Sequence, residues 1–421
     1  MEENSSVVRF RQPDAIDDPL TDILRSGARQ LLAQAVEMEA AAFLAGMKDL
    51  KLPDGRDRVV RHGHGPERTI QTGIGPLAVS SVKIRDRAAI AGDRIRFSSA
   101  IVPKWARRTK SLDALLPVLY LRGISTGDFQ EALAALLGND APNLSPAVVS
   151  RLTAQWQADY DGWQKRDLSA RRYVYVWADG FYLQARMEDN AECMLVLIGA
   201  TPEGKKELVG FQVGVRESAQ SWRELLIDIK LRGLEVAPDL AVGDGALGFW
   251  KAIEEVFPAT RHQRCWVHKT TNVLNKVALS IQVNMKADLR EIYGAPTYAA
   301  AEAAIGVFAD KYGSKYEKAV ACLTKDRNAL LAFFDFPAEH WDHLRTSNPI
   351  ESVFATVRHR TVRTKGALSA KTAKLMVFKL VSAAAKTWRR LKGENQLPKV
   401  VEGVKFQNGI EVIDVPAHHA A

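Results

Sequence analysis

Apolar side chains recur at helical spacing along residues 18–46, where Leu31/Leu32 and Phe43/Leu44 mark one face. This periodicity predicts a long amphipathic helix. Two β-prone runs follow it, TIQT and LAVSSVKI, on either side of an Ile-Gly-Pro turn. Short runs of this kind around a glycine predict a β-hairpin.

The pattern becomes helical again from residue 111. The runs LDALLPVLYLRG, STGDFQEALAALLG and SPAVVSRLTAQW predict three short helices, the last with Ser145 as its cap and Pro146 in its first turn. Three such helices resemble a helix-turn-helix, in which Ser150 and Arg151 would lie near the end that reads DNA. Arg151 is therefore a candidate DNA contact.

Strand patterns begin at residue 174. VYVW predicts a strand that ends at Asp179, and CMLVLIGA and ELVGFQVGV predict two more strands joined through a turn at Gly204. A helix with Ser218 as its cap, the buried strand DLAVG, the helix ALGFWKAIEEVF and a fifth strand, HQRCWV, come next, and a helix follows from about residue 268. Three strands followed by alternating helices and strands predict an α/β fold with a ribonuclease-H-like mixed sheet.

Residues 270–345 are rich in Ala, Lys and Leu, and runs such as YAAAEAAIGVFADKYG have no strand character. We interpret this region as an all-helical insertion into the α/β domain. A mainly helical region, with the candidate helix-turn-helix, precedes that domain.

The composition is typical of a globular protein. The chain has 421 residues, of which 47% are hydrophobic and 25% charged. No apolar run reaches the roughly 18 residues of a membrane span, and the polar N-terminus has no secretory signal pattern. Three cysteines in so long a chain do not suggest a disulfide framework. We expect a soluble, cytoplasmic protein that does not enter the membrane.

The charge distribution favours a polyanionic partner. The net charge is +9, and two separate blocks are strongly basic. Residues 51–125 hold fifteen Lys or Arg against six acids, and residues 352–392 hold eleven against none. Such blocks either form solvated basic surfaces or bind a phosphate backbone.

Three acidic residues are candidates for chemistry, and each also has a plain structural interpretation. Asp179 lies in an Asp-Gly pair typical of hairpin turns, and Asp244 precedes a helix as an N-cap would. Glu351 fits a capping box in which Asn348 is the cap. Asp179 follows the first predicted strand and Asp244 follows the fourth, which lies beside the first in this topology.

If these acids converge, their repulsion favours bound metal ions. Two carboxylates at about 4 Å cost roughly 4 kcal/mol at an effective dielectric near 20. Oxygen ligands favour Mg²⁺, with Mn²⁺ as a substitute, over zinc. Two such ions can activate a nucleophile and stabilise the leaving oxygen of a phosphodiester. The basic residues after Glu351 would then hold DNA, with Arg358 two turns along the same helix face. The further candidates on this segment are Arg360, Arg363 and Lys365.

Other polar residues have weaker patterns. Cys265 and His268 form a Cys-x-x-His pair, but no second pair completes the four ligands of a structural zinc site. Trp266 is either a core residue, which we favour, or a stacking platform for an unpaired base. His340 and His343 have the pattern of helix-surface residues.

Four motifs in order carry a resemblance to a known family. WADGFY with Asp179, AVGDGALGFWKAI with Asp244, HQRCWVHK and TSNPIES with Glu351 resemble the mutator-type DDE transposases of bacterial insertion sequences. The match is good throughout 171–366 and looser before it. One position departs from the family pattern, because Thr271 stands where a basic residue is common.

The resemblance implies that Asp179, Asp244 and Glu351 bind two Mg²⁺ ions on a ribonuclease-H-like domain. It also implies that Arg358 is the basic residue that follows the family's glutamate. Cys265, His268 and Lys269 belong to its Cys/His signature, which supports the site structurally or contacts DNA. We expect the chain to bind terminal inverted repeats and target DNA as a homodimer, in association with the nucleoid.

These expectations divide the chain into six segments. They are an N-terminal helical segment (1–60), a DNA-binding region (61–170), the first part of the catalytic core (171–270), the helical insertion (271–345), closing basic helices of the core (346–393) and a C-terminal tail (394–421).

The sequence thus predicts an enzyme, a Mg²⁺-dependent DNA transposase that cleaves strands and joins them to a target. Two alternatives stay open: a non-catalytic DNA-binding regulator derived from a transposase, and a ribonuclease-H-like nuclease that cuts without joining. A glycosidase with paired carboxylates is disfavoured by the basic charge balance.

Overall fold

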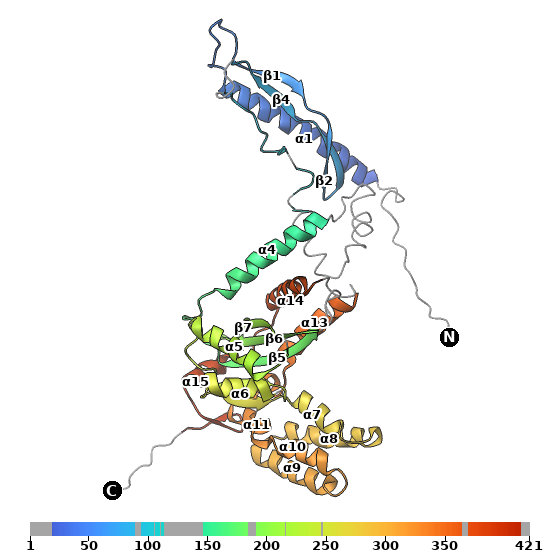
Figure 1. Cartoon of the computed structure of the whole chain (residues 1–421), viewed down its shortest axis with the longest axis vertical. Coiled ribbons are helices and arrows are strands. Elements are labelled where there is room, and N and C mark those ends of the chain that lie inside the picture. Colours follow the sequence, from blue (N-terminus) through green and yellow to red (C-terminus); the bar gives the residue numbers. More distant parts are fainter. Residues whose placement is uncertain are drawn as a thin grey trace, which may run out of the picture. The chain divides into compact units, whose positions relative to one another are not determined.

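The computed structural model in Figure 1 divides the chain into two compact units, Met1–Leu152 and Thr153–Ala421. The residues that it describes are 19–88, 94–104, 106–109, 111–112, 146–183, 191–214, 216–245, 247–363 and 369–413. Each unit is taken by itself below.

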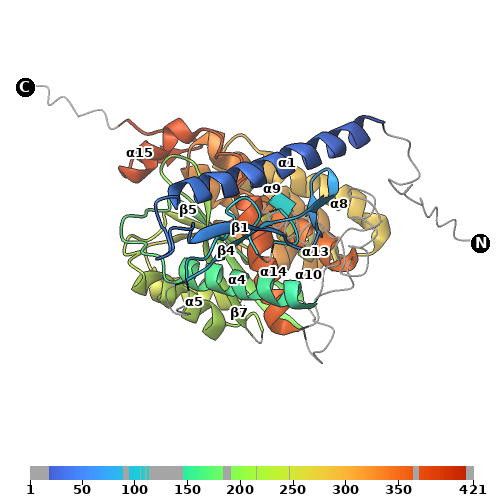
Figure 2. The same ribbon diagram turned by 90° about the horizontal axis from the view of Figure 1, so that it is seen from above.

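The first unit is built on the predicted N-terminal helix, which is confirmed as α1 (Pro19–Gly46). Figure 2 shows α1 running along the strands β1 (Val59–His64) and β4 (Val82–Asp86). The buried face of α1 places Val36 and Ala40 against apolar strand residues in a small hydrophobic core.

The predicted hairpin forms, but one of its two runs is divided. β2 (Arg68–Thr72) pairs with β3 (Gly75–Val79) as expected. LAVSSVKI is not a single strand, because the chain leaves this pairing after Val79 and pairs with β1 as β4 instead. The two halves of this apolar run therefore pair with different strands. The local sequence pattern does not show this division.

The candidate helix-turn-helix cannot be compared in full. Its first two helices lie outside the described residues. The third is confirmed as α4 (Pro146–Gln164), which contains Arg151, although the side chain of Arg151 is not described.

A five-stranded mixed sheet forms the centre of the second unit. Its spatial order is β7-β6-β5-β8-β9. β5, β6 and β7 are an antiparallel meander, whereas β8 pairs parallel with both β5 and β9. The strands are β5 (Tyr175–Leu183), β6 (Glu192–Ala200), β7 (Lys206–Gly214), β8 (Leu240–Gly243) and β9 (Arg261–Arg264).

Two predicted boundaries in this sheet are wrong. β5 does not end at Asp179 but continues to Leu183, and Asp179 pairs with Val196 of β6. The hairpin-turn interpretation of its Asp-Gly pair is therefore excluded. β9 ends at Arg264, and the helix α7 (Trp266–Leu274) begins directly after Cys265. The predicted turn at Gly204 is confirmed, with φ of 73°.

Helices cover both faces of the sheet (Figure 1). On one face, α5 (Ala219–Leu231) and α6 (Leu247–Val256) bury Trp222 and Phe249 against Val176 and Ala178 of β5. The other face packs against α13 (Asn348–Arg363), where the rings of Phe181 and Phe354 lie 4.5 Å apart. Because side chains alternate along a strand, Asp179 lies on the same face as Phe181. α14 (Ala370–Ala385) also covers this side, next to β7.

Only helices occur between β9 and α13. They are α7, α8 (Leu279–Gly294), α9 (Tyr298–Tyr312), α10 (Glu317–Thr324), α11 (Arg327–Leu331) and α12 (Trp341–Leu344), with short 3₁₀ turns at Ala332–Asp335 and Ala338–His340. The chain after α14 adds a 3₁₀ turn at Glu394–Gln396, α15 (Leu397–Val401) and a small hairpin of β10 (Phe406–Gln407) and β11 (Ile410–Glu411). Within the described residues, no helix combines the length and the apolar character needed to cross a membrane.

His340 and His343 are not surface residues as predicted. His340 is fully buried, and its two ring nitrogens lie 2.8 Å from the Tyr175 hydroxyl and 2.8 Å from the Gly393 carbonyl oxygen. His343 is half-buried and accepts a hydrogen bond from the Lys392 backbone N–H. Both histidines connect the sheet to the C-terminal chain, which a helix pattern cannot show.

The buried side chain of Gln263 attaches the helical region to the sheet. Its amide nitrogen donates to the Leu330 carbonyl at 3.0 Å, and its amide oxygen accepts from the Phe333 backbone N–H at 2.8 Å. Gln263 is fully buried, so these bonds have no competition from water.

We expect Gln263→Leu to lower the free energy of unfolding by about 1–3 kcal/mol, because the Phe333 N–H loses its partner inside the protein. Chemical denaturation measures the change. Gln220→Leu, at an exposed position on α5, is the matched control and should shift it by less than about 0.5 kcal/mol. Equal effects of the two substitutions would contradict the anchoring role.

Candidate active site

Three adjacent strands bring their last paired residues into one row. Ala178 of β5 pairs with Gly243 of β8, which pairs with Arg264 of β9. The residues that follow in each strand direction are Asp179, Asp244 and Cys265. Because parallel neighbours are about 4.8 Å apart, these three residues lie side by side at one edge of the sheet.

Asp179 is a buried carboxylate at this edge, with 7% of its surface exposed. One of its oxygens accepts the Gly180 backbone N–H at 2.8 Å. The pKa of Asp179 is raised to about 7, mainly by burial; the charge of His268 and the Gly180 hydrogen bond oppose this shift, and the charges of Asp244 and Glu217 add to it. The two predicted aspartates are thus near enough to repel.

Asp244 is fixed by its own backbone. Its carbonyl oxygen accepts hydrogen bonds from the Trp250 indole N–H at 2.8 Å and from the Arg264 guanidinium at 3.1 Å. The side chain is partly exposed and contributes to the electrostatic field at Asp179, His268 and Glu217. Rigid backbone with an accessible carboxylate is the arrangement that a metal ligand needs.

Glu351 reaches the same edge through the chain segment before α13. The Trp266 backbone N–H donates to the Arg345 carbonyl at 2.8 Å, and the Ser347 backbone N–H donates to the Cys265 sulfur at 3.3 Å. The Ser347 hydroxyl also donates to the Glu351 carboxylate at 3.0 Å. The predicted capping box is incorrect in detail, because α13 already includes Asn348 and the Glu351 carboxylate accepts from the Ser347 hydroxyl.

Cys265 and His268 form a polar pair between Glu351 and the two aspartates. Burial raises the pKa of the Cys265 thiol, but hydrogen bonds from His268 and Ser347 outweigh burial and hold it below its ordinary value. The hydrogen bond to Cys265 raises the pKa of His268 to about 9, with support from the charges of Asp179 and Asp244. His268 therefore places a positive charge among the acids.

Glu217 is a fourth carboxylate at this edge, which the sequence analysis missed. It accepts a hydrogen bond from the Trp222 indole N–H at 3.2 Å and lies over Gly180, where an added Cβ would approach its carboxyl group to 3.1 Å. Burial, followed by the charge of Asp244, raises its pKa. The signal was available in the topology, because β7 ends at the same edge as β5 and Glu217 follows β7 closely.

The donor set fits hard divalent cations. Asp179, Asp244, Glu351 and Glu217 supply carboxylate oxygens against the single imidazolium of His268. Such a site carries excess negative charge in a partly buried place, which Mg²⁺ or Mn²⁺ would relieve. The three predicted acids do not all surround one point. Among the described residues, the metal-binding side chains whose ligand atoms lie within 4.8 Å of one another are Cys265, His268 and Glu351.

The predicted DNA contacts differ in their accessibility. Arg358 is exposed on α13, two turns beyond Glu351. The side chains of Arg360 and Arg363 and all of Lys365 lie outside the described residues.

Lys269 does not fit a DNA contact. It is 4% exposed, it donates to the Cys322 carbonyl at 2.8 Å and it forms an ion pair with Asp326. Cys265 is also buried, at 1% exposure, which does not favour direct contact between this side chain and DNA. Trp266 is a core residue as favoured, because it is buried and donates to the Leu330 carbonyl at 2.9 Å.

Comparison with known proteins gives consistent matches. The family model described as "Transposase, Mutator family" matches residues 2–390. The chain is 49% identical over 298 residues to a transposase for insertion sequence element IS6120 of Mycolicibacterium smegmatis, an alignment that covers 71% of this chain and 92% of the relative. It is 51% identical over 288 residues to the transposase for IST2 of Acidithiobacillus ferrooxidans, with 67% and 95% covered. A more distant relative, at 25% identity over 362 residues, is the transposase for IS256 in transposon Tn4001 of Staphylococcus aureus.

In the metal-free chain we expect the His268 ring to stay protonated at neutral pH, since the hydrogen bond to Cys265 raises its pKa to about 9. Its contribution to the free energy of unfolding is then fully present below the ordinary pKa of 6.5 and is lost as pH rises through about 9. NMR titration of the histidine rings measures the pKa of His268. His343 serves as an internal contrast, because burial lowers its pKa to about 4.

Cys265→Ala should return the pKa of His268 toward its ordinary value, because the largest cause of the shift is removed. Cys322→Ala removes a thiol from another place in the helical region and should leave the pKa of His268 unchanged. A His268 pKa near 6.5 in the unaltered chain would exclude the charged pair.

Proposed function

The chain belongs to the Mutator family of transposases, and from this membership and the geometry of the sheet edge we propose that it is a metal-dependent DNA transposase with Asp179, Asp244 and Glu351 as its catalytic acids. The observation that carries the proposal is the row in which Asp179 and Asp244 follow the paired residues Ala178 and Gly243. Glu351 is held at the same edge because Ser347 donates its hydroxyl to Glu351 and its backbone N–H to the Cys265 sulfur.

The fold supports this assignment. An antiparallel meander extended by two parallel strands, with helices on both faces, is the arrangement of a ribonuclease-H-like domain. We infer that the helices from α7 to α12 are an insertion into that domain, before the helix that carries Glu351. These helices separate Asp244 from Glu351 along the sequence, and both residues still lie at the same edge of the sheet.

Two Mg²⁺ ions, when bound, would activate the attacking oxygen and stabilise the leaving oxygen at a DNA phosphodiester. Asp179, Asp244 and Glu351 are the residues that would hold these ions. Water would be the attacking group in cleavage and a freed 3′-hydroxyl in strand transfer, each in line with the leaving oxygen.

The residues of the chain supply position and charge rather than a covalent intermediate. The Ser347 hydroxyl orients the Glu351 carboxylate, and the Gly180 N–H orients that of Asp179. His268 offsets part of the negative charge before metals bind. Such fixed groups lower the reorganisation that accompanies charge development in the transition state.

DNA is the proposed partner along the exposed basic surface that begins at Arg358. Eleven Lys or Arg and no acid occupy residues 352–392. The terminal inverted repeats and the target DNA are the proposed ligands, and a homodimer is the proposed working form on paired ends.

We expect Asp179→Asn, Asp244→Asn and Glu351→Gln each to abolish cleavage and strand transfer while leaving DNA binding within about threefold of wild type. Each change removes a metal-binding charge without changing the volume of the side chain. The measurement is cleavage and joining of DNA that carries the sequences flanking the gene, together with Mn²⁺ binding by calorimetry.

Asp310→Asn and Glu291→Gln are matched controls, because both residues are exposed on helices away from the acids. They should retain activity and Mn²⁺ binding. Full activity in any of the three site variants removes that residue from the catalytic set. Wild-type cutting without joining would favour a nuclease, and binding without cutting would favour a regulator.

The affinity for DNA should fall about 10³–10⁵-fold between 50 and 200 mM salt if six to ten phosphates are contacted. The reason is that each phosphate contact releases a bound counterion. Fluorescence anisotropy with labelled terminal DNA measures this dependence. A flat response to salt would argue against a backbone-binding role for the basic residues.

A further inference from the structure

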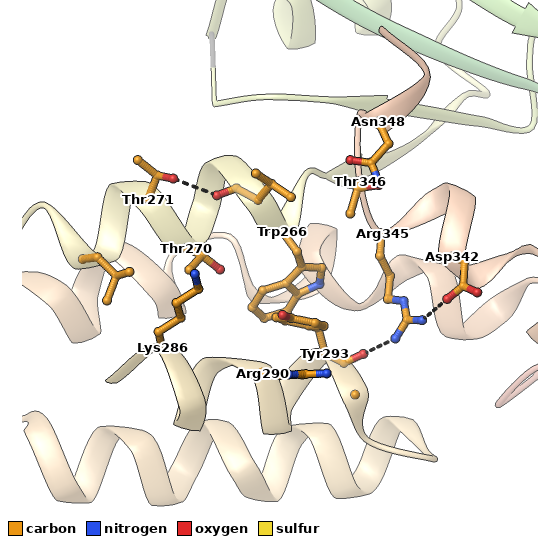
Figure 3. Close-up of a pocket in the computed structure, with 13 residues that line it drawn as sticks. Trp266, Thr270, Thr271, Lys286, Arg290, Tyr293, Asp342, Arg345, Thr346 and Asn348 are labelled. Carbon is orange, nitrogen blue, oxygen red and sulfur yellow. Dashed lines mark hydrogen bonds and ion pairs between the residues drawn. The ribbon is translucent and has the colours of Figure 1, made fainter. Parts of the chain in front are cut away.

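A cavity of about 640 Å³ lies between α7, α8, α12 and the segment that leads into α13. Figure 3 shows Trp266 and Tyr293 in its wall, with Lys286 and Arg290 on the side of α8 and Thr346 and Asn348 on the side of α13. Its size is within the range of about 300–1,000 Å³ that is typical of ligand pockets.

The α8 wall of this cavity is suited to an anion. Lys286 and Arg290 are four residues apart on α8 and both are exposed. Like charges at this spacing destabilise a helix, and neither has an ion-pair partner among the residues that the structure describes. Arg345 also lines the cavity, but its charge is paired with the Asp342 carboxylate at 2.6 Å, and it donates to the Tyr293 carbonyl at 2.6 Å. Lysine and arginine together are the usual ligands of a phosphate group.

The rest of the lining offers an apolar surface and an unused hydroxyl. Val267 is 42% exposed, and the Tyr293 ring packs 5.3 Å from the Trp266 ring. The Thr346 hydroxyl oxygen is buried and has no hydrogen-bond partner within the described part of the chain. Buried polar atoms are nearly always hydrogen-bonded. Because Thr346 lines the cavity, rotation of its side chain would bring this covered oxygen to a ligand that completes the network.

The cavity is joined directly to the proposed catalytic edge. Thr346 and Asn348 line it, and they flank Ser347, whose hydroxyl donates to Glu351. A group bound in the cavity is therefore one short chain segment away from the metal-binding acids. A free small molecule has no evident need for that proximity, whereas a DNA strand under cleavage does.

We propose that this cavity binds one nucleotide of the DNA strand next to the cleaved phosphodiester. Its phosphate lies on Lys286 and Arg290, and its base enters the cavity against Tyr293 and takes a hydrogen bond from Thr346. This inference rests on the proposed transposase function and adds a subsite to it. It places the recognition of the nucleotide beside the cut in the helical region and not in the sheet.

The test uses the full chain and duplex DNA with the element's terminal sequence. A photoreactive pyrimidine is placed on either side of the position that the wild type cuts, and cross-linked peptides are identified by mass spectrometry. We expect a cross-link to the peptide that contains Tyr293 or Thr346. Thr346→Val keeps the side-chain volume, and it should lower the yield of that cross-link several-fold.

Lys286→Ala with Arg290→Ala should reduce the slope of log affinity against log salt by about 2, because two phosphate-contacting charges are lost. Lys318→Ala with Lys325→Ala removes the same charge from exposed positions outside the cavity and is the matched control. It should leave the cross-link yield unchanged.

Each result decides the proposal. A smaller salt slope without any cross-link into the cavity means that only the DNA backbone touches α8, which overturns the nucleotide subsite. Variants that bind, cross-link and cut like the wild type overturn the subsite and leave the transposase function standing. Failure of the wild type to bind terminal DNA overturns the proposed function and the subsite together.

Discussion

The register that sets Ala178, Gly243 and Arg264 in one row across three strands determines where the whole site lies. A slip of one residue would turn Asp179 toward the face that packs against Trp222. The same row positions Cys265, whose backbone N–H donates to the Gly243 carbonyl at 2.8 Å. The convergence of residues that are far apart in the chain is thus a property of backbone pairing.

That convergence concentrates negative charge where water is largely excluded. The pKa of Asp179 rises to about 7 mainly because it is buried, and Asp244 adds to the effect. A fold gains no stability from such an arrangement, and the charge of His268 and the Gly180 hydrogen bond offset only part of it. Sites that keep an unfavourable charge cluster usually do so for function. The repulsion among these carboxylates supports the proposal that cations bind at this edge.

The sequence predicts the three strands of the meander well because they are long, largely apolar runs with a clear turn at Gly204. It fails where a residue's partner is distant in the chain. Lys269 looks like a DNA contact until its pairing with Asp326 is known, and His340 looks exposed until Tyr175 is placed beside it. Glu217 was missed because no local pattern marks it, although the edge at which β7 ends follows from the topology.

The helical region is more than a spacer between two acids. Gln263 and the Trp266 indole both donate to the Leu330 carbonyl, so the helices are attached to the sheet one residue on either side of Arg264 and Cys265. The α8 wall that carries Lys286 and Arg290 is attached separately, because Arg345 donates to the Tyr293 carbonyl and the Tyr293 ring packs on Trp266. Because cleavage depends on holding a phosphodiester within a fraction of an ångström of its ligands, rigid attachment of a neighbouring anion-binding wall is how the region can contribute to chemistry without supplying a catalytic group.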